Sequence, residues 1–202
     1  MANTVPSPPP SSDDGREGPD EGARWARWYE RELGWATEGT APVRLPTGLL
    51  FDVLEVPAVV GRAVLRRMDR TGPVASTGSR TSLLVAAGSA EELPGLLDWL
   101  EWGGVALSLT AVGRGGLITA PVPPGGAAGR SGAAVWLRPP GPLHEGEPVL
   151  PDLVGLGSRG GGAPDLVRLV DTVASECHRA RLTRTRTGRS TEGSATQLLA
   201  FS

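Results

Sequence analysis

The sequence predicts an α+β fold in which a mixed, largely antiparallel sheet is flanked by helices. Two observations support this prediction. Short apolar runs typical of strands alternate along the chain with longer stretches in which apolar residues recur every three or four positions, as in helices. The 29 glycines and 19 prolines of the 202-residue chain often stand at the joins between these runs, where turns are needed.

The first helix is expected at residues 22–34, where Trp25, Trp28 and Tyr29 recur at helical spacing. We expect these aromatic side chains in the core, with stacking on nucleic-acid bases as the alternative interpretation. The first strand is expected at 49–53, an apolar run that lies between a Pro-Thr-Gly turn and a proline.

A second helix is expected at 57–69, because its leading proline suits a first helical turn and its apolar residues form one stripe. Together with strands at 49–53 and 73–76, this helix would make a short βαβ unit. Antiparallel pairing is expected for the remaining strands, at 82–87, 105–112, 117–122 and 133–137.

The third helix is expected at 90–102, where a serine and a glutamate near its start have the spacing of a capping box. Trp99 and Trp102, three residues apart, would share one face of this helix and lie in the core. The last helix is expected at 164–181, where leucines and valines line one side.

These elements predict one ordered domain with loose ends. Residues 1–21 are rich in proline and acidic residues and are expected to be disordered. The domain itself is expected at 22–140, followed by a Gly/Pro-rich linker or insertion at 141–163, the helix at 164–181 and a disordered Arg/Thr/Ser tail at 182–202.

Composition excludes several classes of protein. No apolar run approaches the length of a membrane span, and the first residues lack the basic start and apolar stretch of a secretory signal. We therefore expect a cytoplasmic protein with no membrane partner. The single cysteine, Cys177, excludes a disulfide framework, and the lack of lysine excludes a Walker A motif. A G-x-G-x-x-G pattern at 155–160 has no helix directly after it, so we interpret it as a flexible insertion.

Charge is distributed unevenly along the chain. The net charge is −4 over residues 1–40, −1 over 41–180 and +3 over 181–202, which gives −2 for the whole chain. The basic end could follow a phosphate backbone, and a merely solvated tail is the alternative. Its candidate nucleic-acid contacts are Arg179, Arg181, Arg184, Arg186 and Arg189.

Four segments carry a family resemblance by their order: LPTGLLFDVLEVPAVVGRAVLRRM at 45–68, TGPVASTGSRTSLLVAA at 71–87, EELPGLLDWLEWGG at 91–104 and VWLRP at 135–139. Together they resemble the N-terminal domain of bifunctional DNA primase/polymerases, a family related to the archaeo-eukaryotic primases. The form that they resemble is the small stand-alone protein of actinobacteria. The resemblance covers residues 22–140 and implies a sheet with flanking helices, similar to an RNA-recognition module.

In this family, active members extend a primer with two Mg or Mn ions held by an Asp-x-Asp or Asp-x-Glu pair on one strand. The resemblance makes Asp52 and Glu55 the candidate catalytic residues and Asp52 the candidate metal ligand. These two acids are three residues apart, so the alternation of side chains along a strand points them to opposite faces. The resemblance also implies phosphate contacts by Ser79, Arg80 and Thr81.

The broken acid pair implies a catalytically degenerate primase/polymerase-like protein that binds DNA or a nucleotide. Two alternatives stay open. One is a non-catalytic module for protein interaction or regulation, with a protein as its partner. The other is an active metal-dependent primase/polymerase that uses Asp52, Glu55 and a rearranged acid such as Asp69.

Overall fold

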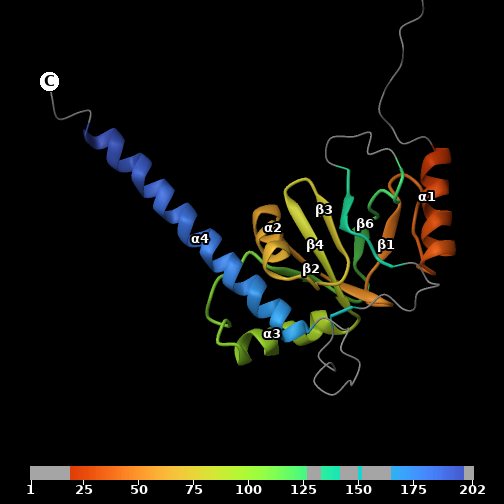
Figure 1. Ribbon diagram of the computed structural model, residues 1–202, viewed down its shortest axis with the longest axis horizontal. Coiled ribbons are helices and arrows are strands. Elements are labelled where there is room, and N and C mark those ends of the chain that lie inside the picture. Colours follow the sequence, from red (N-terminus) through yellow and green to blue (C-terminus); the bar gives the residue numbers. More distant parts are fainter. Residues whose placement is uncertain (1–18, 127–132, 142–149, 152–164, 198–202) are drawn as a thin grey trace, which may run out of the picture.

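The computed structural model describes residues 19–126, 133–141, 150–151 and 165–197, and its fold is α+β. Figure 1 shows a body of strands and helices from which one long helix projects. The helices are α1 (Pro19–Glu32), α2 (Ala58–Arg67), α3 (Ser89–Trp99) and α4 (Leu166–Gln197). The strands are β1 (Arg44–Pro46), β2 (Phe51–Pro57), β3 (Val74–Thr77), β4 (Arg80–Ala86), β5 (Thr110–Val112), β6 (Leu117–Thr119) and β7 (Val135–Arg138).

Five strands form one sheet in the order β5-β2-β4-β3-β7, and each neighbouring pair is antiparallel. The elements β2-α2-β3-β4-α3-β5 follow the split β-α-β order. The expected α+β class is confirmed, but the expected βαβ unit is wrong in its pairing, because β4 lies between β2 and β3. The reason is the tight turn at Gly78 (φ +55°), which folds β4 back along β3 and leaves its other edge for β2.

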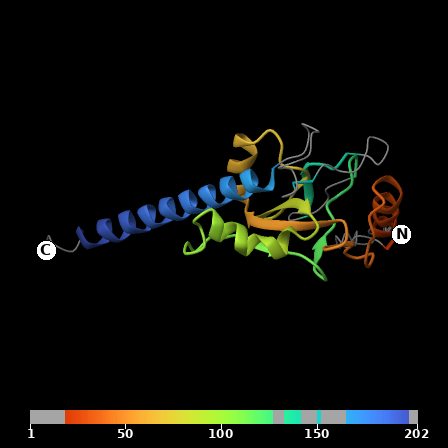
Figure 2. The same cartoon turned by 90° about the horizontal axis from the view of Figure 1, so that it is seen from below.

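One face of this sheet is covered by α2, α3 and α4, and Figure 2 shows α4 and α3 running beside each other there. Side chains at alternate positions of β2 and β4 point toward these helices. Each fully buried leucine or valine contributes about 1.5–3 kcal/mol to folding. The cluster that fixes the helices includes Leu54, Val56, Leu83, Val85, Val60, Val64, Leu93, Leu96, Leu169 and Val173.

The other face is covered by α1 and by the two-stranded sheet of β1 and β6. Tyr29 is fully buried there, and its hydroxyl donates to the Pro121 carbonyl oxygen and accepts from Trp136 Nε1 at 3.2 Å. Trp25 and Trp28 are partly buried against the same cluster. The expectation that these three α1 aromatics contribute to the core is confirmed.

The expectation that Trp99 lies in the core is wrong. α3 ends at Trp99, which is 71% exposed. The chain turns at Glu101, whose φ of +66° is incompatible with a continuing helix, and this turn directs Trp102 back to α4. Trp102 Nε1 donates to Asp171 Oδ1 at 3.0 Å, and its ring packs beside His178. The two tryptophans separate because the helix does not continue between them.

Both ends of the described chain are more helical than expected. α1 begins at Pro19, within the leader expected at 1–21, and the rest of that leader lies outside the described residues. α4 continues to Gln197, so helical backbone occupies most of the expected tail. The hydroxyls of Thr183 and Thr185 each donate to the carbonyl oxygen four residues earlier, which keeps them compatible with the helix. Over the described ranges, no helix combines the length and the apolar character needed to cross a bilayer.

Candidate nucleic-acid interface

Asp52 caps α3 from inside the fold. It is fully buried on the face of β2 that the helices cover. Its Oδ2 accepts hydrogen bonds from the backbone N–H groups of Gly88 and Ala90, both at 2.9 Å. The start of a helix leaves such N–H groups without partners, and its dipole favours a negative charge there. Gly88, the N-cap residue of α3, has no side chain to serve this role, so β2 supplies the cap.

Glu55 lies on the other face of the same strand. β2 pairs with β4 in an unbroken register from Phe51 to Pro57, so its side chains alternate without interruption. Glu55 Oε2 lies 3.4 Å from Arg80 Nη2, which also donates to the Glu55 carbonyl oxygen at 3.2 Å. Two-metal sites hold their ions about 3.5–4 Å apart. The structure therefore does not bring Asp52 and Glu55 together for such a site.

Asp69 does not complete a site with these two acids. It is exposed beyond the end of α2, a helix of 10 residues that begins directly after β2. At about 1.5 Å per residue, α2 separates Asp69 from the end of β2 by about 15 Å. Within the described ranges, no group of three or more His, Cys, Asp or Glu side chains could hold a metal ion. The residues present do not fit the Mg or Mn site that the family resemblance implies.

The three candidate phosphate-binding residues lie at and just after the turn between β3 and β4, and they differ in exposure. Ser79 is exposed, and its carbonyl oxygen accepts from the Ala58 N–H at 2.7 Å, at the start of α2. Thr81 is 1% exposed, and it packs so closely on Gly61 that a Cβ there would overlap its side chain. Burial thus removes Thr81 from any surface contact. Arg80 alone of the three presents a cationic side chain, half-buried at the start of β4.

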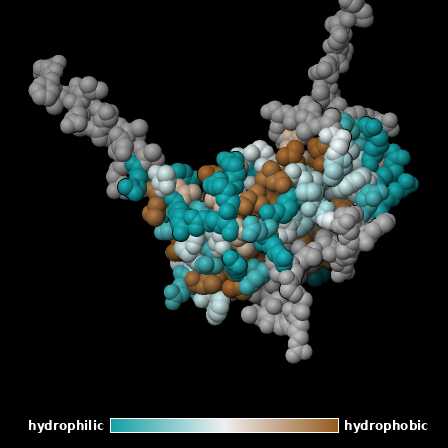
Figure 3. Space-filling model, viewed as in Figure 1, coloured by the Kyte–Doolittle hydropathy of each residue, from teal (hydrophilic) through white to brown (hydrophobic). Residues whose placement is uncertain are grey.

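A concentration of positive charge lies where α2 packs against α4. Residues 58–70 and 166–186 carry nine arginines and three acids, a net charge of +6 in a chain of −2. All nine arginines are exposed. Hydrophilic residues predominate where α4 meets the body of the protein (Figure 3). We give the name basic face to the exposed arginines of these two segments, which are Arg62, Arg66, Arg67, Arg70, Arg168, Arg179, Arg181, Arg184 and Arg186.

Glu176 joins the two helices of the basic face. Its side chain is 9% exposed, and its Oε1 accepts from Arg67 Nε at 2.7 Å and from Arg179 Nη1 at 2.5 Å. One carboxylate therefore fixes an arginine from each helix, which leaves the other N–H groups of both guanidiniums in defined positions. These side chains line a hollow of about 330 Å³ together with Asp171, Thr172 and Ser175.

The arginines expected in a loose tail stand on helical backbone. Arg179 is bound to Glu176, and Arg181 Nη1 donates to the Ala106 carbonyl oxygen at 3.2 Å. The next two along α4 are exposed, and for Arg189 only the backbone is described. The sequence alone points to these tail arginines and misses those of α2. The α2 arginines could have been found from the sequence, because Arg62 and Arg66 have the i, i+4 spacing of one helix face.

Two further sequence features add nothing to the interface. Cys177 is buried in the core, and burial raises the pKa of its thiol, which therefore stays protonated and unreactive at neutral pH. The G-x-G-x-x-G pattern at 155–160 and nearly all of the expected linker at 141–163 lie outside the described residues.

No family model, no curated protein and no solved structure matches the chain. What the described residues offer chemically is thus a pair of acids separated by a sheet, and a face of fixed and exposed arginines. The first arrangement is unsuited to two-metal chemistry, and the second is suited to an anionic polymer.

Proposed function

We propose that the protein is a primase/polymerase-like domain without polymerase activity, which binds nucleic acid through the basic face. One observation carries the proposal: nine exposed arginines lie on α2, directly after α2 and on α4 in a chain that is otherwise acidic. The family resemblance over residues 22–140 implies a core similar to an RNA-recognition module, and the split β-α-β order supports that choice of scaffold.

A phosphate backbone fits the basic face by charge and by spacing. Duplex DNA carries one negative charge per about 1.7 Å of its axis, and arginines that neutralise phosphates release condensed counterions. Arg62 and Arg66 stand one turn apart on α2, about 6 Å along the helix. A guanidinium group presents paired N–H donors that match a phosphate. Several phosphates can therefore be contacted at once along the two helices.

We propose no polymerase activity, because Asp52 and Glu55 are not arranged to share a two-metal site. Asp52 accepts hydrogen bonds from the start of α3, and Glu55 forms an ion pair with Arg80 on the opposite face of the sheet. We expect no template-directed incorporation in a primer-extension assay with Mg or Mn. Incorporation that disappears in Asp52→Asn, a variant that keeps one oxygen acceptor at this position, would show that the acid is catalytic and would contradict this part of the proposal.

Fluorescence anisotropy with labelled single-stranded and duplex DNA tests binding directly. We expect binding that weakens steeply with salt, and a smaller salt dependence in the variant Arg62→Gln/Arg66→Gln. Each phosphate contact that is removed lowers the slope of log affinity against log salt by about one. The wild-type chain and the variant are compared over the same range of salt.

The matched control is Arg24→Gln/Arg31→Gln on α1. It makes the same change of charge at exposed positions, at the opposite end of the molecule from the outer turns of α4 (Figure 1). We expect the control to bind as the wild type does. Absence of binding by the wild type at about 50 mM salt, or equal losses in both variants, contradicts an interface on the basic face.

A protein-interaction role is the second candidate, and one observation favours it. Trp99 exposes 71% of its surface on α3. Tryptophan is enriched at protein–protein interfaces, where its large ring is covered by the partner.

A further inference from the structure

α3 presents an acidic surface around its exposed tryptophan. At about 100° per residue, Glu91, Glu92, Asp98 and Trp99 fall on one side of the helix, and all four are exposed. Residues 81–113 contain four acids and no arginine, a net charge of −4. We call the surface of these four side chains the acidic face.

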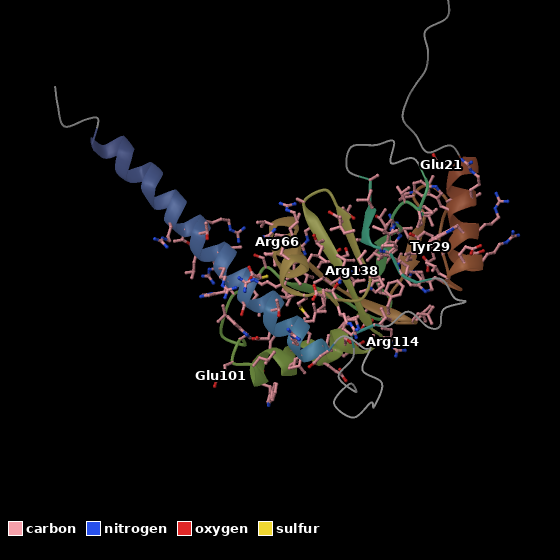
Figure 4. All side chains as sticks on the ribbon, in the orientation of Figure 1. Glu21, Tyr29, Arg66, Glu101, Arg114 and Arg138 are labelled. Atoms are coloured by element: carbon pink, nitrogen blue, oxygen red, sulfur yellow. The ribbon has the colours of Figure 1, made fainter. Side chains whose placement is uncertain are left out.

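The acidic face and the α2 arginines of the basic face lie on different sides of α4. α4 packs against both α2 and α3. In Figure 4, Arg66 of α2 and Glu101, just after α3, are on opposite sides of the α4 ribbon. The acidic face and the α2 arginines therefore do not meet within one copy of the protein, and both are exposed to another copy.

We propose that the acidic face docks on the basic face of a second copy of this chain. Its carboxylates then meet exposed arginines, and the Trp99 ring lies against a guanidinium group, to which its π-electron face is attracted. Such a contact joins two different surfaces, so in a pair one copy keeps an unoccupied basic face and the other keeps an unoccupied acidic face. Further copies add in the same way, head to tail.

Charge complementarity selects a second copy as the partner. One chain carries a region of −4 and a region of +6, and both are present in equal numbers in any solution of the protein. Arginine and tryptophan are also the residue types enriched in protein interfaces. The inference uses the arginines of the basic face and does not depend on nucleic-acid binding. Nucleic acid bound there competes with the second copy.

Sedimentation velocity of the full chain without nucleic acid is the first test. At about 50 mM salt we expect the average mass to rise above the monomer mass with protein concentration, and at about 500 mM salt, where charges are screened over a few ångströms, to return to it. The monomer mass is 20.9 kDa. A monomer at every concentration up to about 1 mM at low salt overturns the inference, since even weak association registers there.

Two charge-reversed variants then test which faces meet. Glu91→Arg/Glu92→Arg reverses the acidic face, and Arg62→Glu/Arg66→Glu reverses the basic face. Each variant alone is expected to associate about tenfold more weakly, from the loss of several ion pairs. Their mixture is expected to associate again, because the intact basic face of the first meets the intact acidic face of the second. If one variant still associates like the wild type, or the mixture gains nothing, the inference fails.

Control variants separate these faces from net charge and from folding. Glu32→Arg/Glu38→Arg changes exposed residues outside both faces by the same charge and is expected to associate like the wild type. Trp99→Ser leaves the charge unchanged and is expected to weaken association several-fold. Unaltered association in Trp99→Ser, or an equal loss in the control pair, overturns the inference. DNA binding by Glu91→Arg/Glu92→Arg is expected to persist, so failure of this inference is distinguishable from failure of the proposed function.

Discussion

Asp52 and Glu55 stand three residues apart on β2 and lie on opposite faces of the five-stranded sheet. The Asp52 carboxylate is buried at the start of α3, whereas the Glu55 carboxylate is half-buried beside Arg80. One strand thus supplies an internal helix cap and an ion pair near the surface. These surroundings predict different responses to substitution.

Asp52→Ala is expected to lower the free energy of unfolding by about 2 kcal/mol, because two backbone N–H groups at the start of α3 lose their carboxylate acceptor. Asp52→Asn keeps one oxygen acceptor and is expected to cost less. Urea denaturation measures both changes. Asp69→Ala, at an exposed position beyond α2, is the control and is expected to change the stability by less than about 0.5 kcal/mol. Similar losses for the two alanine variants contradict the capping role.

The Glu55–Arg80 ion pair is expected to contribute little. The two side chains are 29% and 36% exposed, so water and salt screen their attraction. A double-mutant cycle with Glu55→Gln and Arg80→Gln is expected to give a coupling energy of about 0.2–1 kcal/mol, smaller at high salt. A coupling energy above about 3 kcal/mol that does not change with salt concentration would indicate a desolvated ion pair instead.

Two helical glycines are expected to respond in opposite directions to alanine. Gly61→Ala places a Cβ where it overlaps the buried Thr81 side chain, and we expect a loss of about 2 kcal/mol from this overpacking. Gly95 of α3 has open space around it, so Gly95→Ala is expected to stabilise the protein by about 0.5–1 kcal/mol through helix propensity alone. Thermal unfolding of both variants checks the pair. A stabilising Gly61→Ala is inconsistent with the close packing of α2 on β4.

Alkaline pH is expected to destabilise the protein through Tyr29. Burial raises the pKa of its phenol far above the ordinary value, against a smaller opposing effect of the hydrogen bond from Trp136. The folded state therefore keeps this proton above pH 10, whereas the unfolded chain loses it at about pH 10. Because the folded state then binds more protons, the free energy of unfolding falls as the pH rises past about 10.

Ultraviolet absorbance follows this titration directly, because the chain has a single tyrosine. Tyrosinate is expected to form only as the protein unfolds. Cys177, whose pKa burial also raises, contributes in the same sense, so the comparison is with Tyr29→Phe, in which the alkaline decline is expected to be shallower. Ionisation of Tyr29 near pH 10 in the folded protein contradicts its burial.

Local periodicity predicted much of the fold. The opposite directions of Asp52 and Glu55 follow from the alternation of side chains along a strand, which requires knowledge of that strand alone. The position of β4 between β2 and β3 depends on which edges meet after the hairpin closes, and neither edge is marked in the sequence. Trp99 and Trp102 have the spacing of one helix face, but the helix ends before that face is complete.

The candidate interface was only partly predictable for a similar reason. The arginines of α4 form a visible cluster in the sequence, whereas those of α2 join them only because the two helices pack side by side. Glu176 holds Arg67 and Arg179 together although Arg67 lies far from both in the sequence. Contacts between such distant segments belong to the tertiary structure, and propensity carries no information about them.

α4 is one uninterrupted helix of 32 residues, with its first turns in the core and its last turns standing away from the body (Figure 1). The outer turns and the anchored turns are joined by one continuous helical backbone with its ladder of hydrogen bonds. A force applied to the outer turns is therefore transmitted along α4 to Leu169, Val170 and Val173, which pack in the core. The projecting turns of α4 are thus mechanically coupled to the hydrophobic core.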